Sequence, residues 1–345
     1  MKRLMLTLLI LCFSTNLLAD QQSVINIYGW SGIIPDEIIH QFEKETGIKV
    51  NFSTYDNNEI MYAKLRANNN SGYDLIEPSS YYVDRMRKQG MLEAFDKTKL
   101  HNFHNMNPEF LNHDYDPQNH FSIPLDWGIT GIFVNDDYYQ AHNLQKWSDL
   151  WDKQYHDQLM LLDDSREVFS FALLALGYSP NDIEPAHIKQ AYQKLQELMP
   201  NVKLFSSDAV VSILIDEDAS IGMAWNGDVF KSHQENHHLQ FIYPKEGFII
   251  WVDSFAIPKN APHLANAYRF LDFVMRPDIA KTITLYNNYP TTNSAAQKIL
   301  PDSIRNNPVV YPPHEILKHG QYQTDISDDA LAVYEKYWEQ LKMGG

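Results

Sequence analysis

The chain has 345 residues and an acidic composition, with 28 Lys and Arg against 44 Asp and Glu and a formal net charge of −16. This balance disfavours nucleic acid and anionic membranes as partners, and it favours solubility or a cationic ligand. The length allows a large core and suggests two domains, although no obvious linker separates them.

Residues 1–19 have the plan of a secretory signal peptide, with two basic residues, an apolar run over residues 4–13 and a short polar stretch leading to Ala19. The run is too short for a membrane-spanning helix. We therefore expect cleavage after Ala19 and export of a soluble protein to the periplasm. Cys12, the only cysteine, would leave with the leader, which excludes disulfides and thiolate chemistry from the mature chain. The net charge would become −18, because two cations leave as well.

The first part of the mature chain alternates strand and helix signals. Pro35 suits the first turn of a helix and Gly47 its C-terminal cap. The alternation implies a mostly parallel sheet with helices on both faces. In chain order, the patterns predict a strand over Val24–Tyr28, a helix over Pro35–Thr46, a strand over Ile48–Thr54, a helix over Glu59–Asn68, a strand over Asp74–Glu77, a helix over Tyr82–Gln89, an irregular stretch over residues 101–121 and a strand over Thr130–Asn135.

A second α/β series follows, and a further strand comes late. Asn226 and Gly227 predict a turn after the strand that ends in Trp225. Two series without a linker fit two lobes that are joined by more than one crossover and close over a ligand by hinge motion. The patterns predict strands over Gln158–Leu162, Ser220–Trp225 and Ile249–Pro258, and helices over Ser165–Leu176, Pro185–Met199, Ala261–Met275 and Pro277–Tyr286.

The late strand carries the most informative residues. Its sequence, FIIWVDSFAIP, is apolar apart from Trp251 and Asp253, and a buried carboxylate needs a partner. The earlier strand likewise ends in Trp225. Two tryptophans beside an aspartate could form a box for an organic cation, with ring faces for the methylenes and a carboxylate for the charge. The alternative is that both tryptophans pack in the core and that Asp253 is a turn or capping residue.

Other candidates lie where strands lead into helices, the usual ligand position in open α/β sheets. Asp164 and Glu167 form a D-x-x-E pair at a helix start, so both carboxylates could instead bond to backbone amides as a capping box. Helix N-termini make such a cleft positive, and a cationic ligand would need carboxylates to reverse that field. The remaining candidates are Trp30 with Ser31, Ser79 with Tyr81, and Tyr289.

Nine segments, in a consistent order from about Val24 to the C-terminus, together resemble one known family. They are YGWSGIIPDEIIHQFEKETGIKV, STYDNNEIMYAKL, YDLIEPSSYYVDRMRKQGML, DDSREVF, MPNV, GMAWNGD, YPKEG, WVDSFAIP and YPTTN. The chain resembles the periplasmic spermidine/putrescine-binding proteins of bacterial ABC importers. The resemblance implies an α/β, two-lobed type II periplasmic binding protein fold, each lobe a mostly parallel sheet flanked by helices, with a polyamine in the interlobe cleft.

The same resemblance implies an organisation and a set of partners. We expect a first lobe over residues 20–131 and 256–318, and a second over residues 132–255 and 319–345. Spermidine or putrescine would be the ligand, without a cofactor or a metal, and the protein would be a monomer. Transport would need a membrane permease and an ATPase on other chains.

Carried over position by position, the resemblance also implies the ligand contacts. The aromatic contacts to the polyamine methylenes would be Trp30, Tyr81, Trp225 and Trp251, the carboxylates that pair with its amines Asp164, Glu167 and Asp253, and the polar contacts Ser31, Ser79, Ser207, Tyr289 and Gln323.

Two places depart from the family pattern. After the tryptophan and hydroxyl residue the family usually has an acid and a tyrosine, whereas Gly32 and Ile33 follow here. Asp126 precedes a Trp-Gly pair where the family is typically apolar. One hypothesis is that Asp126 reaches the cleft and partly replaces the missing charge; the other is that it is a solvated hinge residue.

Two other functions fit parts of the sequence. Aromatic faces with carboxylates also suit a sugar or a peptide, although acids beside tryptophans favour amines. A secreted hydrolase could use two carboxylates as acid and base, but the chain has no nucleophile elbow, so we expect no enzyme. His233, His237 and His238 have a spacing that metal sites use, but histidines so spaced on a polar stretch usually form a solvated helix face, so we expect no metal site there.

Overall fold

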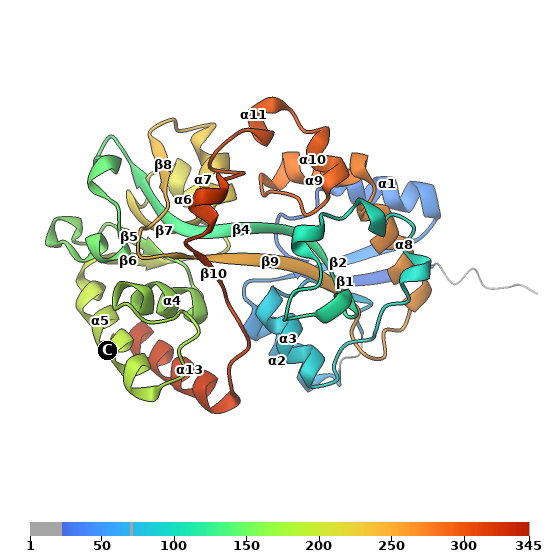
Figure 1. Ribbon diagram of the computed structural model, residues 1–345, viewed down its shortest axis with the longest axis horizontal. Helices are drawn as coiled ribbons and strands as arrows, with labels where there is room; N and C mark the ends of the chain where they lie inside the picture. The colour runs from blue at the N-terminus through green and yellow to red at the C-terminus, as the bar shows by residue number, and fades with distance from the viewer. Residues whose placement is uncertain (1–22, 70–71, 345) are drawn as a thin grey trace, which may run out of the picture.

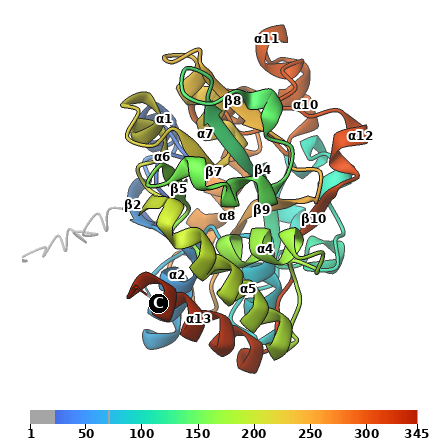
Figure 2. The same ribbon diagram turned by 90° about the vertical axis from the view of Figure 1, so that its left-hand side faces the viewer.

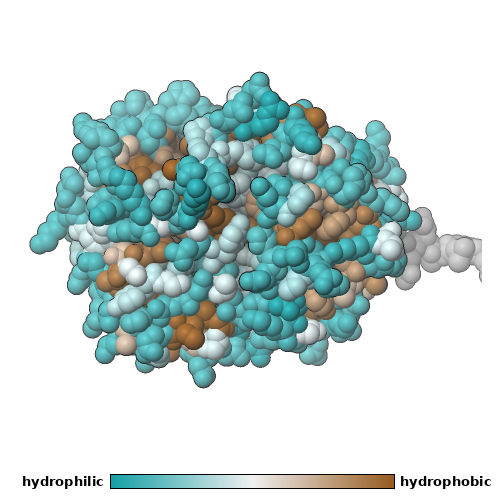
Figure 3. Space-filling view, viewed as in Figure 1, coloured by the Kyte–Doolittle hydropathy of each residue, from teal (hydrophilic) through white to brown (hydrophobic). Residues whose placement is uncertain are grey.

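A computed structural model describes residues 23–69 and 72–344. The predicted signal peptide, residues 1–19 with Cys12, lies outside the described residues and stays a prediction. Within the described ranges, no helix has both the length and the apolar character needed to cross a membrane. The face shown in Figure 3 is mostly hydrophilic, with apolar side chains in separate patches.

A ten-stranded sheet runs through the described part of the chain (Figure 1). Its strand order is β2-β1-β3-β9-β4-β7-β5-β6, with β8 beside β4 and β10 beside β9. The strands at the two ends pair in parallel, and those at the centre pair antiparallel. The strands are β1 (Val24–Trp30), β2 (Lys49–Tyr55), β3 (Leu75–Ile76), β4 (Ser122–Asn135), β5 (Leu159–Leu161), β6 (Val202–Phe205), β7 (Ile221–Trp225), β8 (Leu239–Ile242), β9 (Phe248–Ala256) and β10 (Gly320–Tyr322).

The helices form two groups at opposite ends of β4 and β9 (Figures 1 and 2). One group, with α1, α2, α3 and α8, surrounds the β1–β3 end; the other, with α4, α5 and α13, lies at the β5–β7 end. The helices are α1 (Asp36–Thr46), α2 (Asn58–Ala67), α3 (Ser80–Lys88), α4 (Ser165–Ala175), α5 (Pro185–Leu198), α6 (Val210–Ile215), α7 (Asn226–His233), α8 (Leu264–Val274), α9 (Pro277–Asn287), α10 (Ser294–Lys298), α11 (Asp302–Arg305), α12 (His314–Leu317) and α13 (Asp328–Lys342).

β4 and β9 are the two long strands that connect these groups. All residues of both strands are buried, because elements cover the sheet on both faces. They pair antiparallel, and the register is interrupted by a bulge between Pro124 and Asp126. The sequence predicted only Thr130–Asn135 of β4, because a proline and an aspartate argue against a strand. A bulge accommodates Pro124, because a residue at a bulge does not have to donate an N–H to the neighbouring strand.

Most other predicted elements are confirmed to within a few residues. Pro35 is the N-cap of α1, and Gly47 ends that helix in the left-handed conformation with φ 71°. The turn predicted at Asn226 and Gly227 is wrong, because these residues begin α7. The sequence patterns did not predict α13, whose N-cap Ser327 accepts a hydrogen bond from the Ala330 N–H.

Asn226 explains why the chain continues into a helix at this point. The residue is fully buried, its Oδ1 accepts a hydrogen bond from the Ile129 N–H (2.9 Å) and its Nδ2 donates to the Val309 carbonyl (2.7 Å). One side chain thus ties the start of α7 to β4 and to a distant loop. This junction holds Trp225, the last residue of β7, in place.

We predict that Asn226→Ala lowers the free energy of unfolding, because it leaves the Ile129 N–H buried without a partner and removes one of the two donors to the Val309 carbonyl, the other being the Tyr243 hydroxyl. A buried group without its partner costs about 1–3 kcal/mol. Urea denaturation followed by circular dichroism measures the loss. Asn306→Ala, at an exposed asparagine with no side-chain hydrogen bond, is the matched control and should unfold like the parent. Equal midpoints for both variants would contradict this role of Asn226.

Candidate ligand-binding site

A cavity of about 430 Å³ lies where β1 and β7 end, beside the middle of β9, and where α3, α4 and α7 begin. All twelve residues that the sequence analysis named as ligand contacts line this cavity. They are Trp30, Ser31, Ser79, Tyr81, Asp164, Glu167, Ser207, Trp225, Trp251, Asp253, Tyr289 and Gln323. Residues from distant parts of the chain therefore meet in one place.

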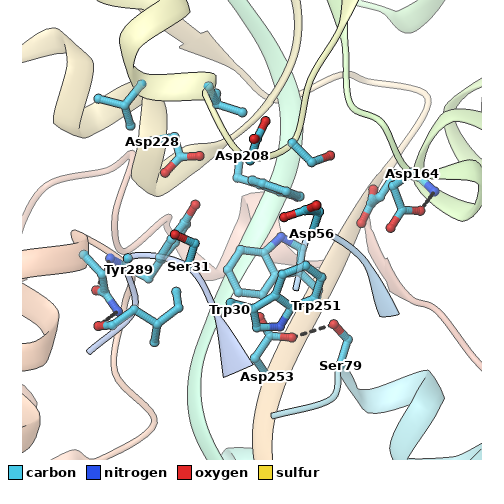
Figure 4. Close-up of a pocket in the computed structure, with 18 of the residues that line it drawn as sticks. Trp30, Ser31, Asp56, Ser79, Asp164, Asp208, Asp228, Trp251, Asp253 and Tyr289 are labelled. Atoms are coloured by element: carbon cyan, nitrogen blue, oxygen red, sulfur yellow. Dashed lines mark hydrogen bonds between the residues drawn. The ribbon is translucent and has the colours of Figure 1, made fainter. Parts of the chain in front are cut away.

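Aromatic rings form the walls of the cavity (Figure 4). The Trp251 and Tyr289 rings meet edge to face with centroids 5.0 Å apart, and Trp30 packs on Tyr55 at 4.6 Å. A Cβ on Gly128 would come within 2.2 Å of the Trp251 indole, so only a glycine in β4 leaves room for that ring. Trp251 is 8% exposed and belongs to a core cluster as well, so it serves both packing and the cavity wall.

Asp253 forms part of the floor, next to the indoles of Trp30 and Trp251 (Figure 4). Its Oδ1 accepts a hydrogen bond from the Ser79 hydroxyl at 2.6 Å. Asn58 extends this chain, because its Nδ2 donates to Ser79 Oγ and to the Tyr81 hydroxyl. Burial raises the pKa of Asp253 to about 7, and the hydrogen bond from Ser79 opposes that rise. Asp253 therefore lines the cavity from within β9 and is neither a turn nor a cap.

Asp164 and Glu167 lie at the start of α4, on one side of the cavity. Asp164 Oδ1 accepts from the Glu167 N–H at 2.9 Å, which makes Asp164 the N-cap. Only this half of the predicted capping box forms, because within the described residues no hydrogen bond joins the Asp164 N–H to the Glu167 carboxyl, whose Oε2 is buried without a partner. Burial and the neighbouring Asp164 charge raise the pKa of Glu167 to about 8. One carboxyl thus caps the helix, and the other is available to a ligand.

A further acid, Asp228, lies on the opposite side of the cavity near Tyr289 (Figure 4). Burial raises its pKa to about 6, and a hydrogen bond with Tyr289 and the charge of Lys231 oppose the rise. The sequence analysis missed Asp228 because it took Asn226–Gly227 for a turn. Read as a helix start after a strand, this segment would have pointed to Asp228, three residues after Trp225. Other lining residues missed by the sequence analysis include Asp56, Asn58, Asp208, Lys231 and Asn287.

Two of the polar contacts predicted from the resemblance, Ser207 and Gln323, form hydrogen bonds with nearby residues. Ser207 Oγ accepts from the Asp163 N–H (3.0 Å), and Gln323 Nε2 donates to Ser170 Oγ (3.1 Å). Both side chains line the cavity with Ser31. These bonds fix the positions of the two side chains at the cavity wall.

The positions that depart from the family pattern differ in whether they line the cavity. Gly32 and Ile33 line the cavity and bring neither acid nor phenol to it. Gly32 has φ +72°, so any other residue there would carry strain of about 1–2 kcal/mol. Asp126 is only 2% exposed, so the solvated-hinge hypothesis is wrong. It is not among the residues that line the cavity; it pairs with Asp253 across β4 and β9.

The three histidines considered for a metal site lie outside the cavity. The His233 and His237 rings contact backbone carbonyls, and His238 lies 3.2 Å from an Asp137 carboxylate oxygen. Across residues 23–69 and 72–344, no group of three or more His, Cys, Asp or Glu is arranged to hold a metal ion.

The cavity is rich in acidic side chains. Six carboxyl side chains and one ammonium line it, the acids being Asp56, Asp164, Glu167, Asp208, Asp228 and Asp253 and the base Lys231. Acids stand on both sides, and indole rings lie between them (Figure 4). Such a cavity can hold an elongated ligand with cationic groups and an apolar spacer, because ring faces attract cations and shield methylenes.

Comparison with known proteins gives a consistent result. Residues 37–311 match the family model of bacterial extracellular solute-binding proteins. The chain is 44% identical over 326 residues to the spermidine/putrescine-binding periplasmic proteins of Salmonella typhimurium and Escherichia coli, covering 94% of this chain and 93% of each relative. It is similar in structure to the spermidine/putrescine ABC transporter substrate-binding protein PotD of Streptococcus pneumoniae, with a TM-score of 0.78, 33% identity and coverage of 93% and 99% of the two chains. The chain therefore belongs to the bacterial extracellular solute-binding protein family.

Proposed function

We propose that this protein captures a polyamine, spermidine or putrescine, in the periplasm and delivers it to the permease of an ABC importer. One observation carries the proposal: acids on opposite sides of the cavity, Asp164 with Glu167 and Asp228, are separated by indole rings (Figure 4). A polyamine has the matching order of charge, methylenes and charge. The names of the relatives point to the same ligand class.

A neutral sugar or peptide is a weaker match to this cavity. Six carboxyl groups against one ammonium would leave negative charge unbalanced around a neutral ligand, and desolvated charge is costly. We also propose no catalysis, since the relatives named above are binding proteins.

The proposal includes closure of two lobes over the ligand. Its lobes are residues 20–131 with 256–318 and residues 132–255 with 319–345, and the protein acts as a monomer. β4 crosses the boundary between residues 131 and 132, and β9 ends at the boundary between residues 255 and 256. Two crossings in adjacent strands support a hinge about the β4–β9 pair.

The decisive experiment combines native mass spectrometry of the protein isolated from the periplasm with calorimetry of the stripped protein. A mass increment of a polyamine, and heats of binding with putrescine, spermidine or spermine but not with maltose or a neutral dipeptide, are expected. Binding of the neutral ligands alone would overturn the proposal.

We predict that Asp253→Asn keeps the fold but weakens polyamine binding by about 2–5 kcal/mol, the range for truncating one partner of a buried charge pair. Titration calorimetry with spermidine measures the loss. Asp329→Asn, an exposed acid in the first turn of α13, makes the same change in net charge and should bind like the parent. Unchanged affinity in a folded Asp253→Asn protein would remove Asp253 from the site.

We also predict that Trp225→Ala weakens putrescine, spermidine and spermine by a similar amount, about 0.5–2 kcal/mol, because an indole face contacts features that all three share. Trp338→Ala is the control, since this half-buried indole packs on Phe205 outside the cavity. It should lower the unfolding midpoint and leave affinity unchanged. A loss confined to one chain length would contradict the shared-contact explanation.

A further inference from the structure

Two buried acids stand behind Asp253 without lining the cavity. Asp126 is the cross-strand partner of Asp253, and Glu77 follows β3, which also pairs with β9. Glu77 is 0% exposed and Asp126 is 2% exposed. We call Glu77, Asp126 and Asp253 the carboxyl cluster. Only Asp253 of the three faces the cavity.

Glu77 and Asp126 each have one carboxyl oxygen that accepts a hydrogen bond and one that does not. The Trp30 N–H donates to Glu77 Oε2 (3.1 Å), and Asn287 Nδ2 donates to Asp126 Oδ2 (2.9 Å). Glu77 Oε1 and Asp126 Oδ1 are buried and accept no hydrogen bond. An ionised carboxylate in this state bears most of its desolvation cost, whereas a protonated one does not.

No cation among the described residues forms an ion pair with the carboxyl cluster. None of the ion pairs within residues 23–69 and 72–344 involves Glu77, Asp126 or Asp253. The neighbouring titratable groups are acids and phenols, namely Tyr55 on β2, Glu167 on α4 and Tyr289 after α9. The charges of the nearest bases act on other acids. Arg166 lowers the pKa of Asp164 and of Glu167, and Lys231 lowers that of Asp228.

We propose that Glu77 and Asp126 are positioning residues that make the carboxyl cluster hold protons when the cavity is empty, so that capture of a ligand ammonium at Asp253 releases a proton. In this step a carboxylic O–H of the cluster breaks and its proton passes to the buffer. The carboxylate that remains balances the ammonium, which keeps its own protons. The inference rests on the proposed polyamine function and adds a proton linkage to it.

The electrostatics support this geometry. Burial, and then the negative charge of their neighbours, raise the pKa of Glu77 and Asp126 well above the usual range, and burial raises that of Asp253 to about 7. Because ligand binding favours the ionised form, affinity should rise with pH until the cluster is ionised, with a slope of about one log unit per proton released.

The stability of the ligand-free protein has the opposite pH dependence to the affinity, because it falls as the pH rises. A carboxyl whose folded pKa exceeds its unfolded value binds more protons in the folded state between those two values. Its stabilising contribution is therefore present below the unfolded pKa and is lost as pH rises through the folded pKa. The cluster thus predicts that the ligand-free protein unfolds at a lower temperature at pH 8 than at pH 6.

The test is titration calorimetry of the full protein with putrescine and with spermidine, in phosphate between pH 6 and 8 for the affinities, and in both phosphate and Tris near pH 7.5 for the proton count. The different ionisation enthalpies of the two buffers give the number of protons released. The parent should release protons, and the Glu77→Gln/Asp126→Asn double variant should release fewer, with at least a twofold flatter slope of log affinity against pH. Each single variant should fall in between.

Two further variants serve as controls. Asp208→Asn removes an exposed acid of the cavity wall, so it should weaken binding without changing the proton count. Glu167→Gln removes a titrating acid on the other side of the cavity, so the drop in its proton count gives the part of the release that comes from Glu167 and not from the carboxyl cluster.

Polyamine binding without proton release by the parent, or an unchanged proton count in the folded double variant, would overturn the linkage and leave the proposed function intact. Absence of polyamine binding by the parent would overturn both. If the double variant does not fold, Asp126→Asn alone decides: a proton count and a pH slope equal to those of the parent would refute the proposal.

Discussion

The antiparallel pairing of β4 with β9 is the constraint on which the rest of the structure depends. β4 and β9 extend from one group of helices to the other. The sheet is therefore continuous, while the elements at its two ends remain separate. The pairing also sets the chemistry of the cavity floor, because its register places Asp126 opposite Asp253 and Gly128 opposite Trp251. The same hydrogen-bond ladder thus positions a carboxyl, an indole and the glycine that makes room for it.

Negative charge that is not balanced inside the protein is the second theme. Carboxyl groups occupy the floor and two opposite sides of the cavity, and Lys231 is the only base among its lining residues. Burial raises the pKa of several of these groups, which means that ionising them in the empty site costs free energy. A cationic ligand relieves that cost. In the proposed function, charge complementarity of this kind selects the class of ligand, and the aromatic rings contact its methylenes.

Capping and binding coincide at α4. A helix N-terminus ordinarily attracts anions, and here the Asp164 side chain occupies that position as the N-cap. The helix is satisfied by the protein's own carboxyl, and Glu167 adds a further negative group beside it. The junction of strand and helix, a common anion site in α/β proteins, is converted in this way into a site for a cation.

The sequence by itself determined most helices and outer strands, since periodicity, caps and Gly or Pro signals act over a few residues. It also determined the twelve lining residues, through the resemblance of nine segments to one family. Only the tertiary structure decided the length of β4, the helix that starts at Asn226 and the places of Asp228 and Glu77. Asp126 was visible as a departure from the family, but its burial was not. The physical reason is that a bulge, a buried amide and a carboxyl cluster depend on partners that are distant in sequence, which local patterns do not contain.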